Sequence, residues 1–126
     1  MIKYDTFRKG GKVSVWIGNL STDMELDDYM NIERDFETDF GFALDGHDMP
    51  ETKVEEKPVP ISNLVDGFSW ADSYAEAVSQ LAKKQGIESA STMVVCINFE
   101  YKPEQARLTS RSRLIFLGVV NFESKT

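Results

Sequence analysis

The segment VSVWIGNLSTDMELDDYM, residues 13–30, decides how the chain folds, because it runs from an apolar strand through a glycine into a helix. Val13, Val15 and Ile17 occupy every second position, which is the period typical of a β-strand. Gly18 ends this strand. The sequence therefore predicts a strand that turns sharply into a helix.

The start of that helix carries its own signal. Thr22 and Glu25 have the spacing of a capping box, in which each side chain accepts a hydrogen bond from a free amide of the first turn. Leu26, Tyr29 and Met30 then form an apolar stripe. We expect the stripe to pack against the sheet.

A strand, a glycine and a helix in this order often hold a phosphate group at the helix N-terminus. Here the first turn is already capped, and its carboxylates would repel an anion. The segment also lacks the glycine patterns of nucleotide-binding loops. We interpret the turn as a structural junction and expect no cofactor.

Two further helices are predicted from apolar spacing and stop signals. A short one covers Arg34 to Phe40 and ends at Gly41. A longer one follows a second box formed by Ser69 and Asp72 and ends at Gly86. Its apolar stripe is Tyr74, Ala77, Val78 and Leu81.

The remaining strands are predicted from short apolar runs. Thr92 to Phe99 and Leu114 to Phe122 are rich in β-branched and aromatic residues, which indicates central strands covered on both faces. Val54 to Ile61 contains Pro58 and Pro60, which cannot donate to a ladder. Any strand there is expected to be short and at an edge.

The chain of 126 residues is long enough to fold as one domain around one core. Gly10-Gly11 closes the first segment, so we expect residues 1–12 to form a flexible arm and residues 13–126 to form the domain. The elements predict an α+β fold. We expect a two-layer sandwich of about four mainly antiparallel strands with two main helices on one face.

Charge is unevenly distributed along the chain. Between Asp23 and Glu56 there are 13 acidic residues and two basic ones, a local net charge of −11, whereas the rest of the chain carries +4. An acidic block of this kind raises the rate of encounter with a basic partner. The alternative is a solvated surface that keeps the protein soluble.

Four potential metal ligands occur close together, at Asp45, His47, Asp48 and Glu51. Their spacing matches neither a calcium-binding loop nor a zinc protease motif, so we expect a solvated turn and no metal. The single cysteine, Cys96, lies inside an apolar run, which predicts a buried, inert thiol.

Two other groups of side chains have alternative interpretations. The arginines between Arg107 and Arg113 lie in an acidic protein without alternating aromatic residues, so we expect no nucleic-acid binding. Trp16, Trp70 and Tyr74 could line an aromatic ligand pocket or fill the core. Carboxylates are too numerous for any pair to indicate acid–base catalysis, and no catalytic residue is assigned.

Several short motifs together are similar to one known family. They are VSVWIG at residues 13–18, ELDDYM at 25–30, DFETDFGF at 35–42, LVDGFSWADSYAEAV at 64–78, VVCINFEY at 94–101 and LIFLGVVNF at 114–122. The chain from Lys12 to Phe122 resembles the immunity protein 22 family of bacterial polymorphic toxin systems. The connection from Tyr101 to Ser112 and the LDGHDMPE turn do not match the family pattern.

The resemblance implies a non-enzymatic antidote that binds and blocks a cognate toxin domain, and it carries over no toxin-binding residue. Our own candidates come from the acidic block, which would suit a basic toxin such as a nuclease. They are Asp23, Glu25, Asp27, Asp28, Asp35 and Asp39. The alternatives are a small-ligand-binding or enzymatic domain that uses the aromatic pocket, and a homo-oligomeric interaction module.

The expected location is the cytoplasm. A lone cysteine cannot form an internal disulfide, and no apolar segment follows the basic residues near the start. No apolar run approaches the roughly 20 residues that a bilayer requires, so we expect no membrane association.

Overall fold

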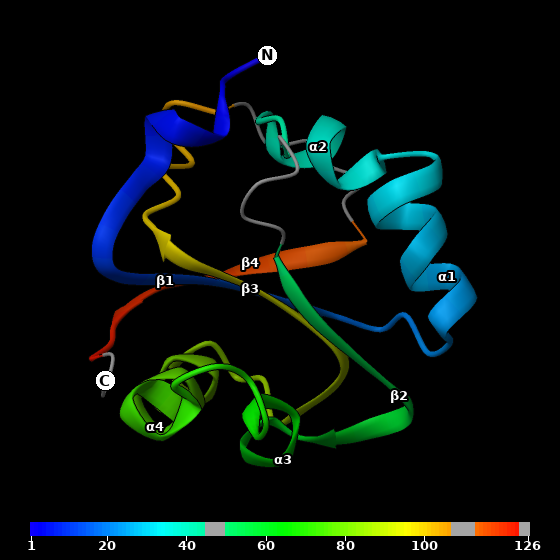
Figure 1. The fold of residues 1–126 in the computed structure, drawn as a ribbon. Coiled ribbons are helices and arrows are strands. Elements are labelled where there is room, and N and C mark those ends of the chain that lie inside the picture. The colour runs from blue at the N-terminus through cyan, green and yellow to red at the C-terminus, as the bar shows by residue number, and fades with distance from the viewer. Residues whose placement is uncertain (45–49, 107–112, 124–126) are drawn as a thin grey trace.

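The computed structural model describes residues 1–44, 50–106 and 113–123. Four strands form one antiparallel sheet in the order β2-β3-β1-β4 (Figure 1). They are β1 (Arg8–Gly18), β2 (Glu51–Pro60), β3 (Ser89–Phe99) and β4 (Leu114–Asn121). The α+β class and the antiparallel strands are confirmed.

Helices cover both faces of the sheet, whereas the sequence predicted helices on one face. The upper face in Figure 1 carries the 3-10 turn η1 (Tyr4–Phe7), α1 (Asp23–Asp27), the π turn η2 (Asp28–Ile32) and α2 (Asp35–Phe40). The lower face carries α3 (Ile61–Val65), which the sequence did not predict, and α4 (Ala71–Lys84). The physical reason is that β1 and β3 are apolar on both sides, so each face of the sheet requires cover.

Alternate residues of β1 contribute to two separate cores. Val13, Val15 and Ile17 join the cluster under α3 and α4, which we call the lower core. Trp16 joins the cluster under α1, η2 and α2, which we call the upper core. Ser14 is also buried, and its hydroxyl donates to Phe99 O at 2.8 Å. The alternation predicted from the sequence is therefore correct, but both sides of the strand are inside.

Gly18 is required by the packing of strands. A Cβ atom at this position would lie 2.5 Å from Leu114 Cδ2 and 2.7 Å from Arg113 O. The next residues are tied to β3, since Leu20 O accepts the Ser91 hydroxyl at 2.6 Å. The turn after β1 therefore packs against β4 on one side and is hydrogen-bonded to β3 on the other.

The structure does not set residues 1–12 apart from the domain. Tyr4 and Phe7 are each only 2% exposed and pack against Phe42 and Phe99 in the upper core. Strand β1 begins at Arg8 and crosses the two glycines. The sequence analysis placed the boundary at a glycine pair, but apolar burial continues on both sides of it.

The two edges of the sheet are β2 and β4. The edge position of β2 agrees with its prolines, and its register with β3 shifts between Val54 and Val59. Strand β4 was predicted to be central, and this was wrong, because it pairs with β1 alone among the described strands. Its apolar sequence instead supplies Leu114 and Leu117 to the two cores.

Helix α4 is the longest helix, and its start differs from the expected box. Its N-cap is Trp70, which has a left-handed φ of 57° and no side-chain cap. The Ser69 N–H donates instead to Glu51 on β2, at 2.9 Å. Tyr74 and Val78 of the predicted stripe are buried and Leu81 packs beside them, whereas Ala77 faces solvent.

Candidate partner-binding face

Helix α1 starts at the cap that the sequence predicted. Thr22 Oγ1 accepts the Glu25 N–H at 3.1 Å. The Glu25 carboxylate accepts the N–H and the hydroxyl of Ser21, each at 3.2 Å, and also the Thr22 hydroxyl. These hydrogen bonds lower the pKa of Glu25, with the Ser21 N–H contributing most. Glu25 is thus ionised and fixes the first turn.

Helix α1 continues directly into the π turn η2. The Glu33 N–H donates to Asp28 O at 2.9 Å, five residues back. Tyr29 and Met30 point into the upper core. Two large apolar side chains of the same helical segment point the other way: Met24 is 75% exposed and Ile32 is 66% exposed.

Helix α2 is held in place by an ion pair. Its buried Glu37 accepts hydrogen bonds from the Arg34 guanidinium and, at 2.9 Å, from the Leu44 N–H. Burial opposes ionisation of Glu37, but these donors outweigh it and lower the pKa of the carboxyl. Gly41, with φ of 76°, ends the helix as the sequence predicted. The pair joins the start of α2 to the chain beyond it.

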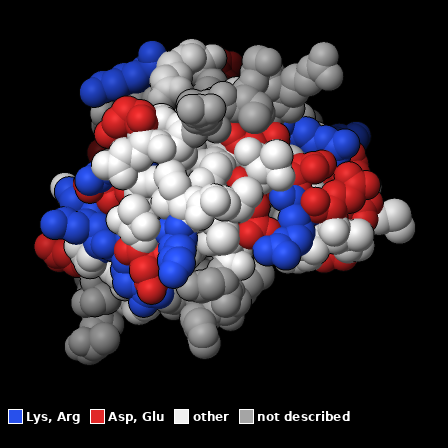
Figure 2. All heavy atoms as spheres, turned by 90° about the horizontal axis from the view of Figure 1, so that it is seen from above, with Lys and Arg blue, Asp and Glu red and all other residues white. Residues whose placement is uncertain are grey.

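The six carboxylates proposed from the sequence lie on these three elements, above the upper core. Asp23, Glu25 and Asp27 of α1 are exposed, whereas the other three are half-buried: Asp28 on η2, and Asp35 and Asp39 on α2. Figure 2 shows Asp and Glu gathered at the right, the side on which Figure 1 shows α1. We call the outer surface of α1, η2 and α2 the acidic face.

The carboxylates of the acidic face differ in their availability to a partner. Asp39 accepts the Tyr29 hydroxyl at 2.7 Å, and Asp27 accepts the Asn31 amide at 2.8 Å. Asp23, in contrast, makes no ion pair with a described residue. We therefore expect Asp23 to be more available to a partner than Asp27 or Asp39.

A small hollow of about 170 Å³ lies between α1, η2 and the start of β2. Acidic and amide groups border it, and apolar side chains of the helix contribute to its lining. The lining residues are Asp23, Leu26, Asp27, Met30, Asn31, Pro50 and Thr52. This combination can accommodate the apolar stem and the charged end of a lysine or arginine side chain.

The aromatic pocket considered from the sequence is not formed. Trp16 is fully buried in the upper core and Tyr74 in the lower core, on opposite faces of the sheet. Trp70 is 41% exposed and lies 5.8 Å from Phe122, measured between ring centroids. The three residues therefore cannot line one site.

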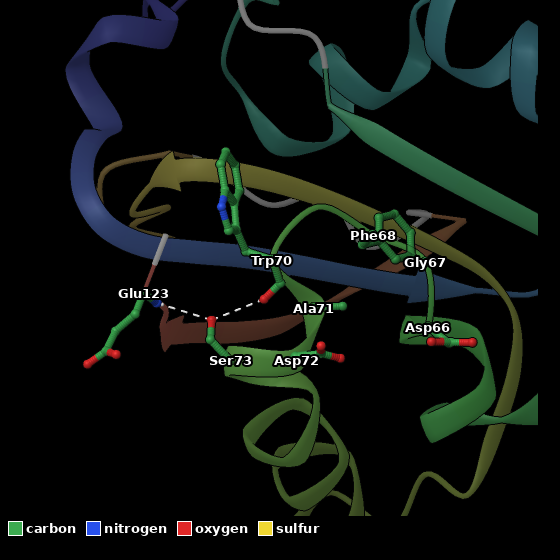
Figure 3. A pocket seen from close by; sticks show the side chains of 8 residues that line it. All are labelled: Asp66, Gly67, Phe68, Trp70, Ala71, Asp72, Ser73 and Glu123. Atoms are coloured by element: carbon green, nitrogen blue, oxygen red, sulfur yellow. Dashed lines mark hydrogen bonds between the residues drawn. The ribbon is translucent and has the colours of Figure 1, made fainter. Parts of the chain in front are cut away.

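Trp70 instead borders a hollow of about 350 Å³ at the start of α4 (Figure 3). Ser73 links its walls, because its hydroxyl donates to Trp70 O at 3.0 Å and accepts the Glu123 N–H at 3.1 Å. The lining is Asp66, Gly67, Phe68, Trp70, Ala71, Asp72, Ser73 and Glu123. It contains no nucleophile paired with a base, so it lacks the geometry of covalent catalysis.

The reactive side chains elsewhere have structural roles. Cys96 is fully buried, and burial raises the pKa of its thiol, as expected for an inert cysteine. Tyr101 donates to Phe40 O at 2.7 Å, and burial raises its pKa to about 12. Both side chains remain neutral at pH 7.

Several sequence candidates fall outside the part of the chain that the structure describes. Asp45, His47 and Asp48 lie there, as do the arginines at 107 and 111. Glu51 is described and is engaged with Ser69. Within residues 1–44, 50–106 and 113–123, no three His, Cys, Asp or Glu side chains are grouped to hold a metal. No described helix combines the length and apolar character needed to cross a membrane.

The sequence analysis missed the exposed apolar residues of the acidic face. Met24 was counted as part of the helix, and Ile32 was not singled out. Helical periodicity is the signal that could have identified Met24. Leu26, Tyr29 and Met30 define the buried side of the helix, and Met24 lies outside that apolar stripe.

Comparison with known proteins agrees with the resemblance drawn from the motifs. A family model described as Immunity protein 22 matches residues 13–123. No curated protein and no solved structure matches the chain. The match covers the sheet except residues 8–12 of β1, the whole lower core and the whole acidic face, and it leaves out Tyr4 and Phe7 of the upper core. The chain belongs to the immunity protein 22 family.

Proposed function

We propose that this immunity protein neutralises a cognate toxin of a bacterial polymorphic toxin system by binding it, without catalysis, through the acidic face. The family supports the immunity role. The observation that supports this location is the combination, on one helical segment, of exposed carboxylates with two exposed apolar side chains, Met24 and Ile32.

The charge of the face favours a basic partner. The segment that forms it lies in the acidic block of the sequence, where the net charge is −11. Arg34, one of the two basic residues of the block, is already paired with Glu37. A toxin that acts on nucleic acid is basic because it must bind phosphate, so a nuclease is the proposed target. Opposite charges would steer the two proteins together.

The exposed apolar residues would supply short-range binding energy that charge alone does not provide. Protein interfaces commonly have an apolar centre that is shielded from water and a polar rim. Most of the binding energy comes from a few such central residues. Met24 and Ile32 would form the centre, with Asp23, Asp27 and Asp28 as the rim.

The test uses the toxin domain encoded beside the gene and measures association by stopped flow at several salt concentrations. The variant Asp23→Asn/Asp27→Asn/Asp28→Asn removes three charges from the face. We expect its association rate at low salt to fall about tenfold or more, with a weaker salt dependence. The matched control Asp66→Asn/Asp72→Asn/Glu76→Gln removes three exposed charges from the lower side. It should leave the rate nearly unchanged.

The apolar centre is tested separately, with Met24→Ala and Ile32→Ala. These variants should increase the dissociation rate and leave the association rate unchanged, because short-range contacts act after encounter. If the two triple variants slow association equally, net charge acts without a defined face and the proposed location is wrong. If this protein abolished the nuclease activity of the toxin without forming a stable complex with it, neutralisation by binding would be contradicted.

A further inference from the structure

The two edge strands of the sheet are protected very differently. Strand β2 contains two prolines and five charged residues, and its register is broken. The charged residues are Glu51, Lys53, Glu55, Glu56 and Lys57. Such features prevent another strand from adding to an edge. Strand β4 has the sequence LIFLGVVN, with neither a charged residue nor a proline. The edge formed by β4 therefore lacks the usual sequence protection.

The backbone direction of β4 can be read from its pairing with β1. The Phe122 N–H donates to Gly11 O at 3.0 Å. Backbone groups of an antiparallel strand face alternate sides, so Val120 also faces β1 while Val119 and Asn121 face away. Among the described residues, no strand pairs with that outer side. Val119 and Asn121 thus present backbone donors and acceptors at an edge that no described strand covers.

The side chains near this edge are also apolar. Ile115 is 54% exposed, and the residues from Phe116 to Val120 are half-buried or buried. The strand has one irregularity at Leu117, where the register with β1 shifts, and Gln85 donates to the Leu117 carbonyl at 2.8 Å. The regular part available for pairing is therefore Gly118 to Asn121.

We propose that two copies of this protein associate by antiparallel pairing of their β4 edges, which joins the two sheets into one. Antiparallel pairing of identical strands has two-fold symmetry, so each copy supplies the same groups to the other. The inference rests on the sheet edge and is independent of the proposed toxin-binding face. That face lies on α1, η2 and α2, not on β4.

Charge favours a second copy as the occupant of this edge. The protein has a net charge of −7, so two copies repel each other in most orientations. Strand β4 has no charged residue, so repulsion is weaker when the copies meet at this edge. Antiparallel pairing also brings the start of one strand toward the end of the other. Exposed Arg113 precedes β4 and exposed Glu123 follows it, so unlike charges would approach at both ends.

The experiment measures the mass of the purified protein by sedimentation velocity, from low micromolar to several hundred micromolar. We expect the mass to rise toward that of a dimer. Val119→Pro and Asn121→Pro each remove one outward N–H of the pairing segment Gly118 to Asn121. Because a symmetric interface contains each change twice, the dissociation constant should rise about tenfold or more. The control Ile32→Lys changes an exposed isoleucine on η2, outside β4, and should dimerise normally.

Circular dichroism establishes that each variant is folded. If Val119→Pro does not fold, Asn121→Pro decides, because Asn121 is exposed and proline is tolerated on an edge strand where its nitrogen faces away from the sheet. A wild-type protein that stays monomeric at the highest concentration would overturn the proposal. So would a dimer that survives the β4 substitutions, or one that is lost in Ile32→Lys, since either result places the interface elsewhere.

Discussion

The two cores on either side of the sheet are built from different side chains. In the upper core, Trp16 is surrounded by rings, with ring centroids 5.1 Å away at Phe36 and 5.2 Å away at Phe116. The lower core is mostly aliphatic and lies under the 14-residue helix α4. On the upper side, α1 and η2 together form one helical segment of only ten residues, and α2 has six.

This difference shows how an irregular layer can be held rigidly. Helical segments of six to ten residues are too short to be stable by themselves, so tertiary contacts must fix them. Aromatic rings bring a large buried area and preferred mutual orientations. The upper core thus anchors α1, η2 and α2 from below, and their outer surface is left free to carry charge. The lower side depends more on a regular helix.

The largest expected effect is that of Trp16→Ala in the upper core. Removing a fully buried tryptophan at the centre of the ring cluster should lower the free energy of unfolding by about 3–5 kcal/mol. Urea denaturation followed by circular dichroism measures this value. Hydrogen exchange should show that the amides of α1 and α2 lose more protection than those of α4. Equal loss in all three helices would contradict separate anchoring of the two layers.

A smaller effect is expected for Val78→Ala in the lower core. Val78 is fully buried on α4, and the substitution removes two methyl groups, for a loss of about 2 kcal/mol. The better helix propensity of alanine offsets part of this loss. The same urea denaturation applies. A loss as large as that of Trp16→Ala would mean that the aromatic core is no more important than the aliphatic one.

The smallest expected effect is that of Glu37→Gln, and it depends on pH. Because the pKa of Glu37 is lower in the folded protein than its usual 4.5, ionised Glu37 stabilises the fold above that pH. Stabilisation is lost as pH falls through the lowered pKa. At pH 7 the variant should be less stable by about 1 kcal/mol, since glutamine keeps an acceptor for Leu44 but loses the charge pair with Arg34.

Urea denaturation of both proteins between about pH 7 and pH 3 tests this prediction. The difference in unfolding free energy should be constant at neutral pH and shrink in acid. A difference that stays constant down to the lowest pH would show that the charge of Glu37 does not contribute. In the lower core no described charged side chain is buried, so Val78→Ala should show no such pH dependence.

Local sequence signals predicted much of the fold. The alternation in β1, the Thr22 cap and the stop at Gly86 depend on neighbouring residues, and the structure has all three. The family could also be recognised from short motifs. These features are visible in sequence because their causes lie within a few residues.

Features set by distant residues could not be predicted in the same way. The order of strands places β4 at an edge, although its composition is that of a central strand. The expected box at Ser69 is replaced by a bond to Glu51, which is 18 residues away in the chain. The exposure of Met24 and Ile32 depends on which side of the helix meets the sheet. Each case is decided by tertiary contacts.

The central position of β1 determines when the protein can fold. Its partners come much later in the chain: Val15 pairs with Val95 on one side and with Gly118 on the other. During synthesis, β1 must wait for β3 to leave the ribosome before its first pairing can form, and for β4 before its second. Contacts between such distant segments also slow folding. The sheet, and with it the support beneath the acidic face, would therefore be complete only after the last strand has been made.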